Sequence, residues 1–484
     1  MERIDYIAKT DGRLTISGAP AGYDAWLATE AARRRGGLVL FVASDEAQAE
    51  AFSAAATFFA PGIRQLSFPA WDCLPYDRVS PKPDIESARL ATLAALIKGV
   101  EGAALIVTSV AAVLQRVPPR AAIAKASFTA KVGEEIERDG LVSFLAGNGY
   151  ARAGTVRDPG DFALRGGIVD LWPPGTDDPL RLDFFGEMLD AIRKFDPVTQ
   201  LSRDSVARVE LLPASEAPLG TAAISRFRAG YVAAFGPSGD DPLYESVSVG
   251  RKAQGMEHWL PLFYDGLDTL FDYLPRSLIL LGHQVEESKT ARLELVSECY
   301  DTRDQLRRQD PDARVKSVPY KPLKVKTLYL DDGEWKAALG RHLVRDLTPF
   351  QVPEGKTSVD AGGRQGRDFA PERTDGNLNV FQAAADHLLA LQGAGKRVLV
   401  ASWTDGSAER MGGVLSDHGV SAIRKVADWP EALKLDTRAV GLACLGIERG
   451  FETQEFAVLS EQDMLGDRMV RAQSRQRRAQ NFLS

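Results

Sequence analysis

The chain has 484 residues, 44% of them hydrophobic and 26% charged, with a formal net charge of −7. This length predicts several domains with large apolar cores, and the acidic balance gives no overall electrostatic attraction to nucleic acid. No apolar run of about 18 residues is present, which excludes a transmembrane helix. The three cysteines are far apart and the five histidines are scattered, which argues against a disulfide framework and a metal site and suits a reducing cytosol.

Residues 1–125 and 211–350 have the same α/β character. In both, short apolar runs that suit buried strands alternate with helical patterns, which is typical of a parallel sheet covered by helices. We therefore expect one such sheet, built in two segments and interrupted by an inserted module. Its expected elements are strands at 14–17, Leu38–Ala43, 105–108 and 277–281, and helices at Tyr23–Arg35, 45–59 and 286–307.

Residues 126–210 predict an α+β insertion, with a helix at 141–148 followed by a three-stranded hairpin unit. Strands are expected at 163–172 and Leu180–Phe185, joined by a turn rich in proline and aspartate. Because side chains alternate across a strand, Leu180, Leu182 and Phe184 share a core face. The opposite face carries Arg181, Asp183 and Phe185. Arg165, on the preceding strand, could lie across from this face.

Phe185 has two possible roles on this charged face. It could pack against another part of the chain, for example through Phe195. Alternatively, it could contact a protein partner, because arginine and aromatic residues are enriched where proteins bind one another most strongly. The pattern alone does not choose between the two.

The rest of the chain divides into three parts. Residues 351–376 are polar and contain glycine and proline without periodicity, which predicts a linker or long loop. Residues 377–470 predict a small α/β domain, and residues 471–484 form a basic connector. The expected elements of the small domain are helices at 378–391 and 406–418 and strands at 397–401, 439–445 and 456–459.

The loop after the first strand has the glycines of a phosphate-binding P-loop but not its chemistry. Gly18 and Gly22 are present, whereas Tyr23 stands where the lysine is needed and Asp24 where a hydroxyl residue would bind Mg²⁺. A carboxylate at this point would repel phosphate, so this degenerate P-loop is not expected to bind ATP productively. No Ser-His-Asp, Cys-His or paired-carboxylate arrangement stands out, and we interpret His258 as a packed core histidine.

Four blocks of sequence resemble one known family. The chain is similar to the N-terminal part of the bacterial transcription-repair-coupling factors, and its first two blocks are also similar to the repair protein UvrB. The blocks are FPAWDCLPYDRVSPKPDIESARLATL from Phe68, residues 160–200, GMEHWLPLFYD from Gly255, and VLSEQDMLGDRMVRAQSRQRR from Val458.

The resemblance implies a degenerate helicase-like (P-loop-type) parallel-sheet domain in two segments, an inserted UvrA-binding module and a further small α/β domain. In the family, an RNA-polymerase-interaction domain and ATP-driven translocase domains follow, so the chain is expected to be an N-terminal fragment. The resemblance further implies no cofactor for this chain, with ATP and Mg²⁺ used only by the motor domains. It implies a cytoplasmic location, and RNA polymerase and double-stranded DNA as partners of the full-length protein.

By motif, the resemblance assigns UvrA binding to Arg165, Arg181 and Phe185, on adjacent strands. The first hypothesis is therefore a non-enzymatic chain that recruits UvrA by mimicking the surface of UvrB. An alternative is a UvrB-like ATP-dependent helicase, against which Tyr23 and Asp24 argue. A third is a regulatory clamp, since the family's C-terminal domain is thought to mask the UvrA-binding face.

Overall fold

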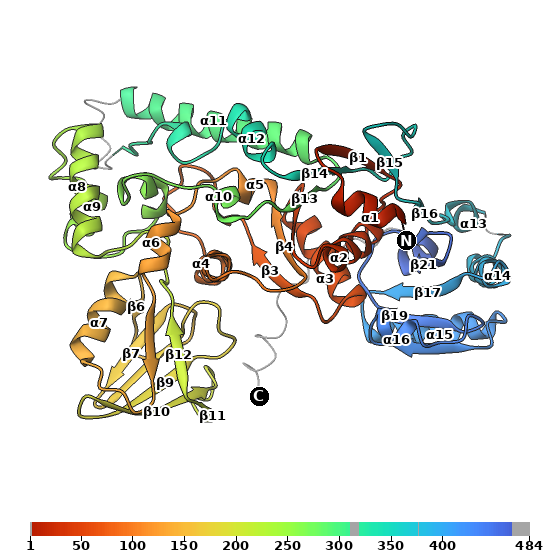
Figure 1. Cartoon of the computed structure of the whole chain (residues 1–484), viewed down its shortest axis with the longest axis horizontal. Helices are drawn as coiled ribbons and strands as arrows, with labels where there is room; N and C mark the ends of the chain where they lie inside the picture. Colours follow the sequence, from red (N-terminus) through yellow and green to blue (C-terminus); the bar gives the residue numbers. More distant parts are fainter. Residues whose placement is uncertain (1, 310–318, 376, 467–484) are drawn as a thin grey trace.

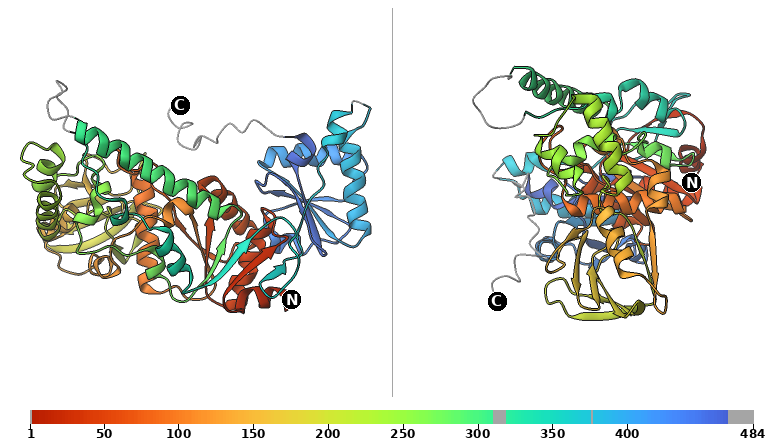
Figure 2. Two further views of the ribbon diagram at one scale, coloured as in Figure 1. Left: turned by 90° about the horizontal axis from the view of Figure 1, so that it is seen from above. Right: turned by 90° about the vertical axis from the view of Figure 1, so that its left-hand side faces the viewer.

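The computed structural model describes residues 2–309, 319–375 and 377–466. These residues form a mixed α/β structure with a seven-stranded sheet, two six-stranded sheets and a two-stranded sheet. The seven-stranded sheet lies in the middle, with one six-stranded sheet toward each end of the molecule (Figures 1 and 2). The basic connector at 471–484 lies outside the described residues.

The central sheet is parallel throughout, in the order β15-β1-β14-β13-β2-β4-β3. Strands β13 and β14, which follow the inserted module in the chain, lie between β1 and β2, which precede it. Segments from both sides of the module therefore build one sheet. The strands are β1 (Arg13–Ser17), β2 (Leu38–Ala43), β3 (Arg64–Phe68), β4 (Ala104–Ser109), β13 (Leu278–Leu281), β14 (Leu343–Leu347) and β15 (Ser358–Asp360).

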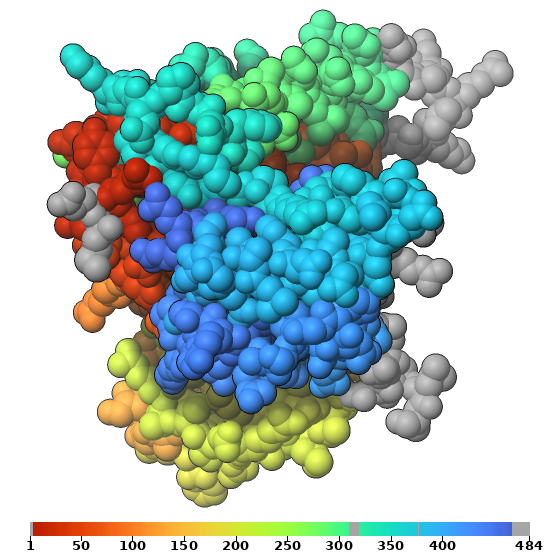
Figure 3. Space-filling view, turned by 90° about the vertical axis from the view of Figure 1, so that its right-hand side faces the viewer, coloured from red at the N-terminus to blue at the C-terminus, as the bar shows by residue number. Residues whose placement is uncertain are grey.

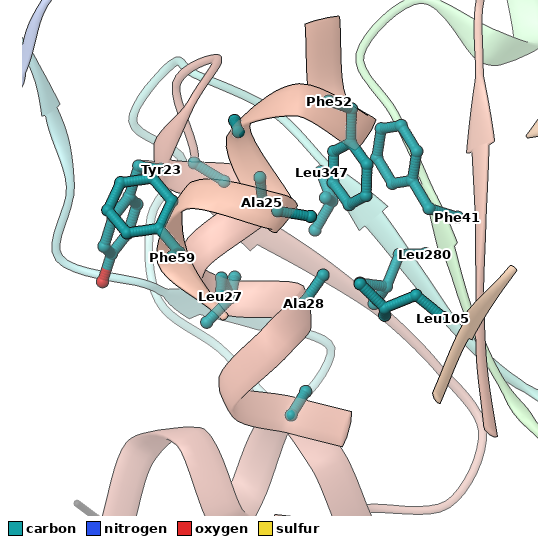
Figure 4. Close-up of a cluster of buried hydrophobic side chains, with 14 of the residues drawn as sticks. Tyr23, Ala25, Leu27, Ala28, Phe41, Phe52, Phe59, Leu105, Leu280 and Leu347 are labelled. Carbon is teal, nitrogen blue, oxygen red and sulfur yellow. The ribbon is translucent and has the colours of Figure 1, made fainter. Parts of the chain in front are cut away.

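Helices cover both faces of this sheet because alternate strand residues point to opposite sides. On one face Phe41 stacks on Phe52 and joins the alanine-rich side of α2 (Figure 4). On the other face Leu40 and Val42 join a separate core. The first face is covered by α1 (Glu2–Lys9), α2 (Tyr23–Arg35) and α3 (Glu46–Phe59), and the second by α4 (Pro83–Lys98), α5 (Val110–Val113), α10 (Leu270–Tyr273), α11 (Val285–Gln309) and α12 (Asp332–Leu339).

The inserted module is larger than the three-stranded unit expected from the sequence. It is a six-stranded sheet in the order β11-β10-β9-β8-β7-β6, beside a two-stranded sheet of β5 and β12. The expected strand at 163–172 was wrong, because Gly166 adopts a φ of 60° and breaks it into two antiparallel strands. The elements are α6 (Arg120–Lys125), β5 (Phe128–Lys131), α7 (Arg138–Gly147), β6 (Ala151–Arg152), β7 (Asp161–Arg165), β8 (Ile168–Leu171), β9 (Leu180–Phe185), β10 (Met188–Phe195), β11 (Ser202–Val206) and β12 (Arg208–Leu211).

A third core joins the module's exit to the central sheet domain. The aromatic loop after β3 is buried in it through Trp71 and Tyr76, next to Trp259, as a structural loop rather than an exposed platform. The helices around this core are α8 (Thr221–Phe235), α9 (Pro242–Ser248), the 3-10 helix η1 (Met256–Leu262) and the short η2 (Val325–Thr327).

The second six-stranded sheet has the order β16-β20-β21-β17-β19-β18. It packs against the central sheet domain, and Figure 3 shows the outer surface of the domain that it forms with its helices. Its elements are β16 (Arg364–Gln365), α13 (Ala370–Thr374), α14 (Val380–Gly393), β17 (Arg397–Ser402), α15 (Asp405–Asp417), β18 (Ile423–Val426), α16 (Trp429–Ala432), β19 (Val440–Cys444), β20 (Phe451–Glu452), β21 (Phe456–Ser460) and α17 (Glu461–Leu465).

The segment expected to be a linker is in fact built into two sheets. Residues 358–360 form β15 beside β1, whereas Arg364 and Gln365 form β16 beside β20. The expectation of a loop at 351–376 was therefore wrong, because very short strands that pair with distant partners leave no periodic pattern in the sequence.

A buried ion pair fixes the module to the central sheet domain. Arg89 of α4 donates to the carboxylate of Glu216, which follows β12, and both side chains are fully buried. Arg89 also donates to the carbonyl of Pro69 at 2.9 Å, and its guanidinium lies 4.2 Å from the ring centre of Phe68. One turn earlier on α4, Glu86 accepts from the hydroxyl of Ser215 at 2.9 Å.

Replacing Arg89→Met should lower the free energy of unfolding by about 3–5 kcal/mol, because it leaves the Glu216 carboxylate buried without its partner. Chemical denaturation followed by tryptophan fluorescence measures this, since Trp71 lies 5.8 Å from the guanidinium. The double replacement with Glu216→Leu should recover most of the loss. A loss of less than 1 kcal/mol for Arg89→Met alone would contradict this role.

Candidate protein-docking site

The strand register places the three predicted docking residues on one face of the module's sheet. Arg165 pairs with Ile168, Ile168 pairs with Asp183, and Arg181 and Phe185 flank Asp183 along β9. All five side chains therefore lie on the same side. The two arginines are not on adjacent strands, as the resemblance implied, because β8 lies between β7 and β9. The opposite face is the module's core, which includes Leu180 and Leu182 as expected.

Phe185 is exposed, so it does not have the internal packing role that was one of the two possibilities left open by the sequence. Its side chain is 85% accessible at the tip of the β9–β10 hairpin, where it pairs with the partly exposed Met188. Phe195 does not cover it, since that residue is fully buried with Val156 and Trp172. The hairpin tip is also held in place, because the amide of Ile136 donates to the carbonyl of residue 187 at 2.8 Å.

Arg181 is largely used within the module. Its guanidinium donates to both carboxylate oxygens of the buried Asp170, at 2.8 and 3.0 Å, and this hydrogen bonding raises the pKa of Arg181. It also donates to the carbonyl of Gln200 and the hydroxyl of Ser202, and lies 5.0 Å from the ring centre of Phe195. Only 17% of the side chain is exposed. Arg181 therefore has most of its donors engaged within the module and only a small part of its side chain accessible.

Arg165 is a freer cation than Arg181. It is exposed and donates to the carbonyl of Gly154 at 2.8 Å and the hydroxyl of Thr155 at 2.9 Å. Among the described residues, no carboxylate is recorded in an ion pair with it. Arg138 donates to the carbonyl of Gly166, the residue that follows Arg165. No pattern in the sequence singles out Arg138, and the pairing of Asp170 with Arg181 depends on the register between β8 and β9.

The loop with the P-loop glycines lies between β1 and α2, as expected from the sequence. Other parts of the chain pack against this loop. The hydroxyl of Tyr23 donates to the carbonyl of Ala361 at 2.9 Å, and its ring stacks on Trp26. A Cβ on Gly18 would meet Asp360 and Arg364 at 2.5 and 2.6 Å. The tyrosine and the strap at 360–364 thus take up space around the loop that an open phosphate site needs.

Asp24 is a buried carboxylate within the same loop. It is 6% exposed, and its Oδ1 accepts from the amides of Gly22 at 2.9 Å and Ala25 at 2.7 Å. Burial raises its pKa to about 7, against the opposing effect of these hydrogen bonds. The carboxylate therefore satisfies the loop's own amides, which are the groups that would otherwise contact a phosphate.

His258 and Cys73 lie side by side but do not form an activated catalytic pair. His258 is 1% exposed, and burial lowers its pKa to about 4, in agreement with a core histidine. Its neighbour Cys73, at 3.8 Å, has a pKa raised to about 12 by burial, so no reactive thiolate forms at neutral pH. Among the described residues there is no group of three or more metal-ligating side chains. A search of the same residues finds no helix that could span a membrane.

The module is similar to a known domain family. The family described as the UvrB interaction domain matches residues 128–216, which contain all three candidate docking residues. Longer matches extend over most of the chain. It is 28% identical to the transcription-repair-coupling factor of Escherichia coli, over 94% of this chain and 38% of that protein. The Rickettsia bellii factor is 28% identical over 89% of this chain and 37% of that protein.

A shorter match has higher identity. The Haemophilus influenzae transcription-repair-coupling factor is 35% identical over 46% of this chain and 20% of that protein. These matches confirm the resemblance carried by the four sequence blocks: the chain is similar to the N-terminal region of the transcription-repair-coupling factors. The chain spans about two-fifths of the length of the Escherichia coli and Rickettsia bellii factors.

Replacing Asp24→Asn should raise the free energy of unfolding at pH 8 by about 1–3 kcal/mol. The buried carboxyl has its folded pKa raised to about 7, above the ordinary 3.8, so ionisation opposes folding as the pH rises between these values. The gain should therefore disappear near pH 4 and reach its full size above pH 7. Denaturation curves at several pH values measure it, and a gain independent of pH would contradict this cause.

Proposed function

We propose that the chain recruits UvrA to stalled RNA polymerase in transcription-coupled nucleotide excision repair, by presenting the surface with which UvrB binds UvrA. The observation that carries this proposal is the 85% exposure of Phe185, on a face that also presents Arg165 and Arg181. A large aromatic left in water on a rigid hairpin suits an anchor that enters a partner's pocket. The match of this region to the UvrB interaction domain supports the same partner.

Each of the three residues has a distinct part in this docking. Phe185 supplies apolar area, and full burial of such a side chain is worth about 2 kcal/mol. Arg165 supplies a positive charge that can donate to an acidic group of UvrA. Arg181 has most of its donors occupied by Asp170 and the following turn, so it positions the face and offers one remaining edge.

We further propose that the central sheet domain is a degenerate helicase-like domain that neither binds ATP nor requires a cofactor. Its parallel sheet with a glycine loop after β1 supports the likeness, and Tyr23 and Asp24 support the loss of nucleotide binding. The chain on this proposal is not itself an enzyme and acts in the cytoplasm. RNA polymerase and double-stranded DNA are proposed partners of the full-length transcription-repair-coupling factors.

Replacing Phe185→Ala should weaken binding to UvrA by on the order of 2 kcal/mol, or roughly 30-fold, because it removes the apolar anchor. Arg181→Ala should cost a similar amount of binding. Titration of UvrA against the purified chain, by calorimetry or surface plasmon resonance, measures both. Phe350→Ala is the matched control, since that phenylalanine is 66% exposed on a different domain and should leave binding unchanged.

Stability measurements separate the two docking variants. Phe185→Ala should leave the melting temperature unchanged, whereas Arg181→Ala should lower the free energy of unfolding by about 1–2 kcal/mol because Asp170 loses its partner. If the double alanine variant binds UvrA like the parent chain, the proposed docking face is wrong.

A UvrB-like ATP-dependent helicase is the second candidate, favoured by the position of the glycine loop between β1 and α2. We expect the purified chain to show no DNA-stimulated ATP hydrolysis. The variant Tyr23→Lys with Asp24→Thr should not restore it, because the strap at 360–364 still occupies the space beside Gly18. Hydrolysis by the parent chain that rises on adding DNA would reverse the order of the two candidates.

A further inference from the structure

The three most exposed of the large apolar side chains that the structure describes all belong to the inserted module. They are Phe185, Val198 and Leu201, at 85%, 71% and 68%. Phe185 is the proposed anchor, but the other two lie on the turn between β10 and β11, which neither the sequence nor the proposed docking residues single out. Large apolar groups gathered at exposed positions mark interaction surfaces more often than isolated ones do.

The turn at residues 196–201 is rigidly built. The carboxylate of Asp196 accepts from the amides of Val198 at 2.9 Å and Thr199 at 2.8 Å. The amide of Gln200 donates to the carbonyl of Asp196, and its side chain donates to the carbonyls of Val156 and Pro197. Gln200 has a φ of 61°, which costs a non-glycine residue on the order of 1 kcal/mol. The turn thus holds Val198 and Leu201 at the surface in one conformation, which reduces the entropy lost on binding.

The turn is continuous with the proposed docking face. Arg181 contacts it directly, by donating to the carbonyl of Gln200 at 3.4 Å and to the hydroxyl of Ser202 at 3.2 Å. Phe185 lies at one end of β9 and this turn lies beyond the other end, next to β10 and β11 (Figure 1). Five residues of strand separate the two ends by roughly 17 Å. A standard interface of about 800 Å² per partner is wide enough to cover both.

We propose that Val198 and Leu201 form a second apolar contact for UvrA, at the opposite end of the docking face from Phe185. The inference rests on the proposed function. Arg181 joins the two ends, since the same guanidinium fixes Asp170 in the sheet and the backbone of the turn. Its role in binding would then be partly to hold Val198 and Leu201 in position, and not only to contact the partner.

The double variant Val198→Ser with Leu201→Ser tests this with UvrA as the probe. Its affinity for UvrA should fall by at least about tenfold, because two apolar side chains lose their contact. Its melting temperature should stay that of the parent, since both side chains are exposed. The matched control is Val249→Ser with Leu433→Ser, which changes a valine and a leucine that are 66% and 52% exposed outside the module, and which should bind UvrA unchanged.

The outcomes separate this inference from the proposed function. If Phe185→Ala weakens binding and the turn variant does not, the second contact is wrong and the proposed function stands. If neither variant affects binding, the docking face itself is wrong. If the turn variant leaves UvrA affinity intact but reduces self-association in sedimentation velocity, the turn contacts a second copy of the chain, which also overturns the inference.

Discussion

The arrangement of the module depends on one buried ion pair, between Arg89 and Glu216. Removing two charges from water is expensive, and such a pair is tolerated only where further hydrogen bonds satisfy it. Here the carbonyl of Pro69 and the ring of Phe68 complete the surroundings of Arg89. Glu216 lies just after β12 and Arg89 lies on a helix of the central sheet domain, so the pair joins the module's exit to that domain. The hydrogen bond from Ser215 to Glu86 and the ion pair between Lys98 and Glu210 join the same two parts of the chain.

The three residues of the proposed docking face differ in how far their side chains are engaged within the fold. Arg181 donates hydrogen bonds to the buried Asp170 and to the turn at 196–201, so most of its interactions stabilise the fold. Phe185 makes the opposite contribution, since its exposed ring adds little to the fold and leaves its apolar area available. Arg165 lies between these extremes, bound to backbone and hydroxyl oxygens but not to a carboxylate in any recorded ion pair. The same amino acid therefore has two roles on one face, decided by whether a carboxylate lies beside it.

Strand alternation was enough to predict which face carries Arg181 and Phe185, because a period of two is a local property of the chain. The bounds of the helix at Tyr23–Arg35 and of the strands at Leu38–Ala43 and Leu180–Phe185 could likewise be predicted from the sequence. What could not be predicted depends on distant contacts. Prediction of the break at Gly166 requires knowing that the strands on either side of it pair with each other. Strands β15 and β16 are so short that only their pairing with β1 and β20 defines them. The salt bridge from Arg181 to Asp170 similarly needs the register between β8 and β9.

Two features join the central sheet domain to the second six-stranded sheet. Tyr23 and Trp26 of α2 pack against Phe451 and Phe456, and residues 358–365 contribute a strand to each of the two sheets. A lysine at position 23 would bring a charge into this apolar contact, at a cost of several kcal/mol unless it found a partner. The residue that is unsuited to hold a phosphate is thus the residue that joins two domains. The side chain that stands where a P-loop has its lysine therefore makes an interdomain contact, and the loop serves as a structural joint between the two domains.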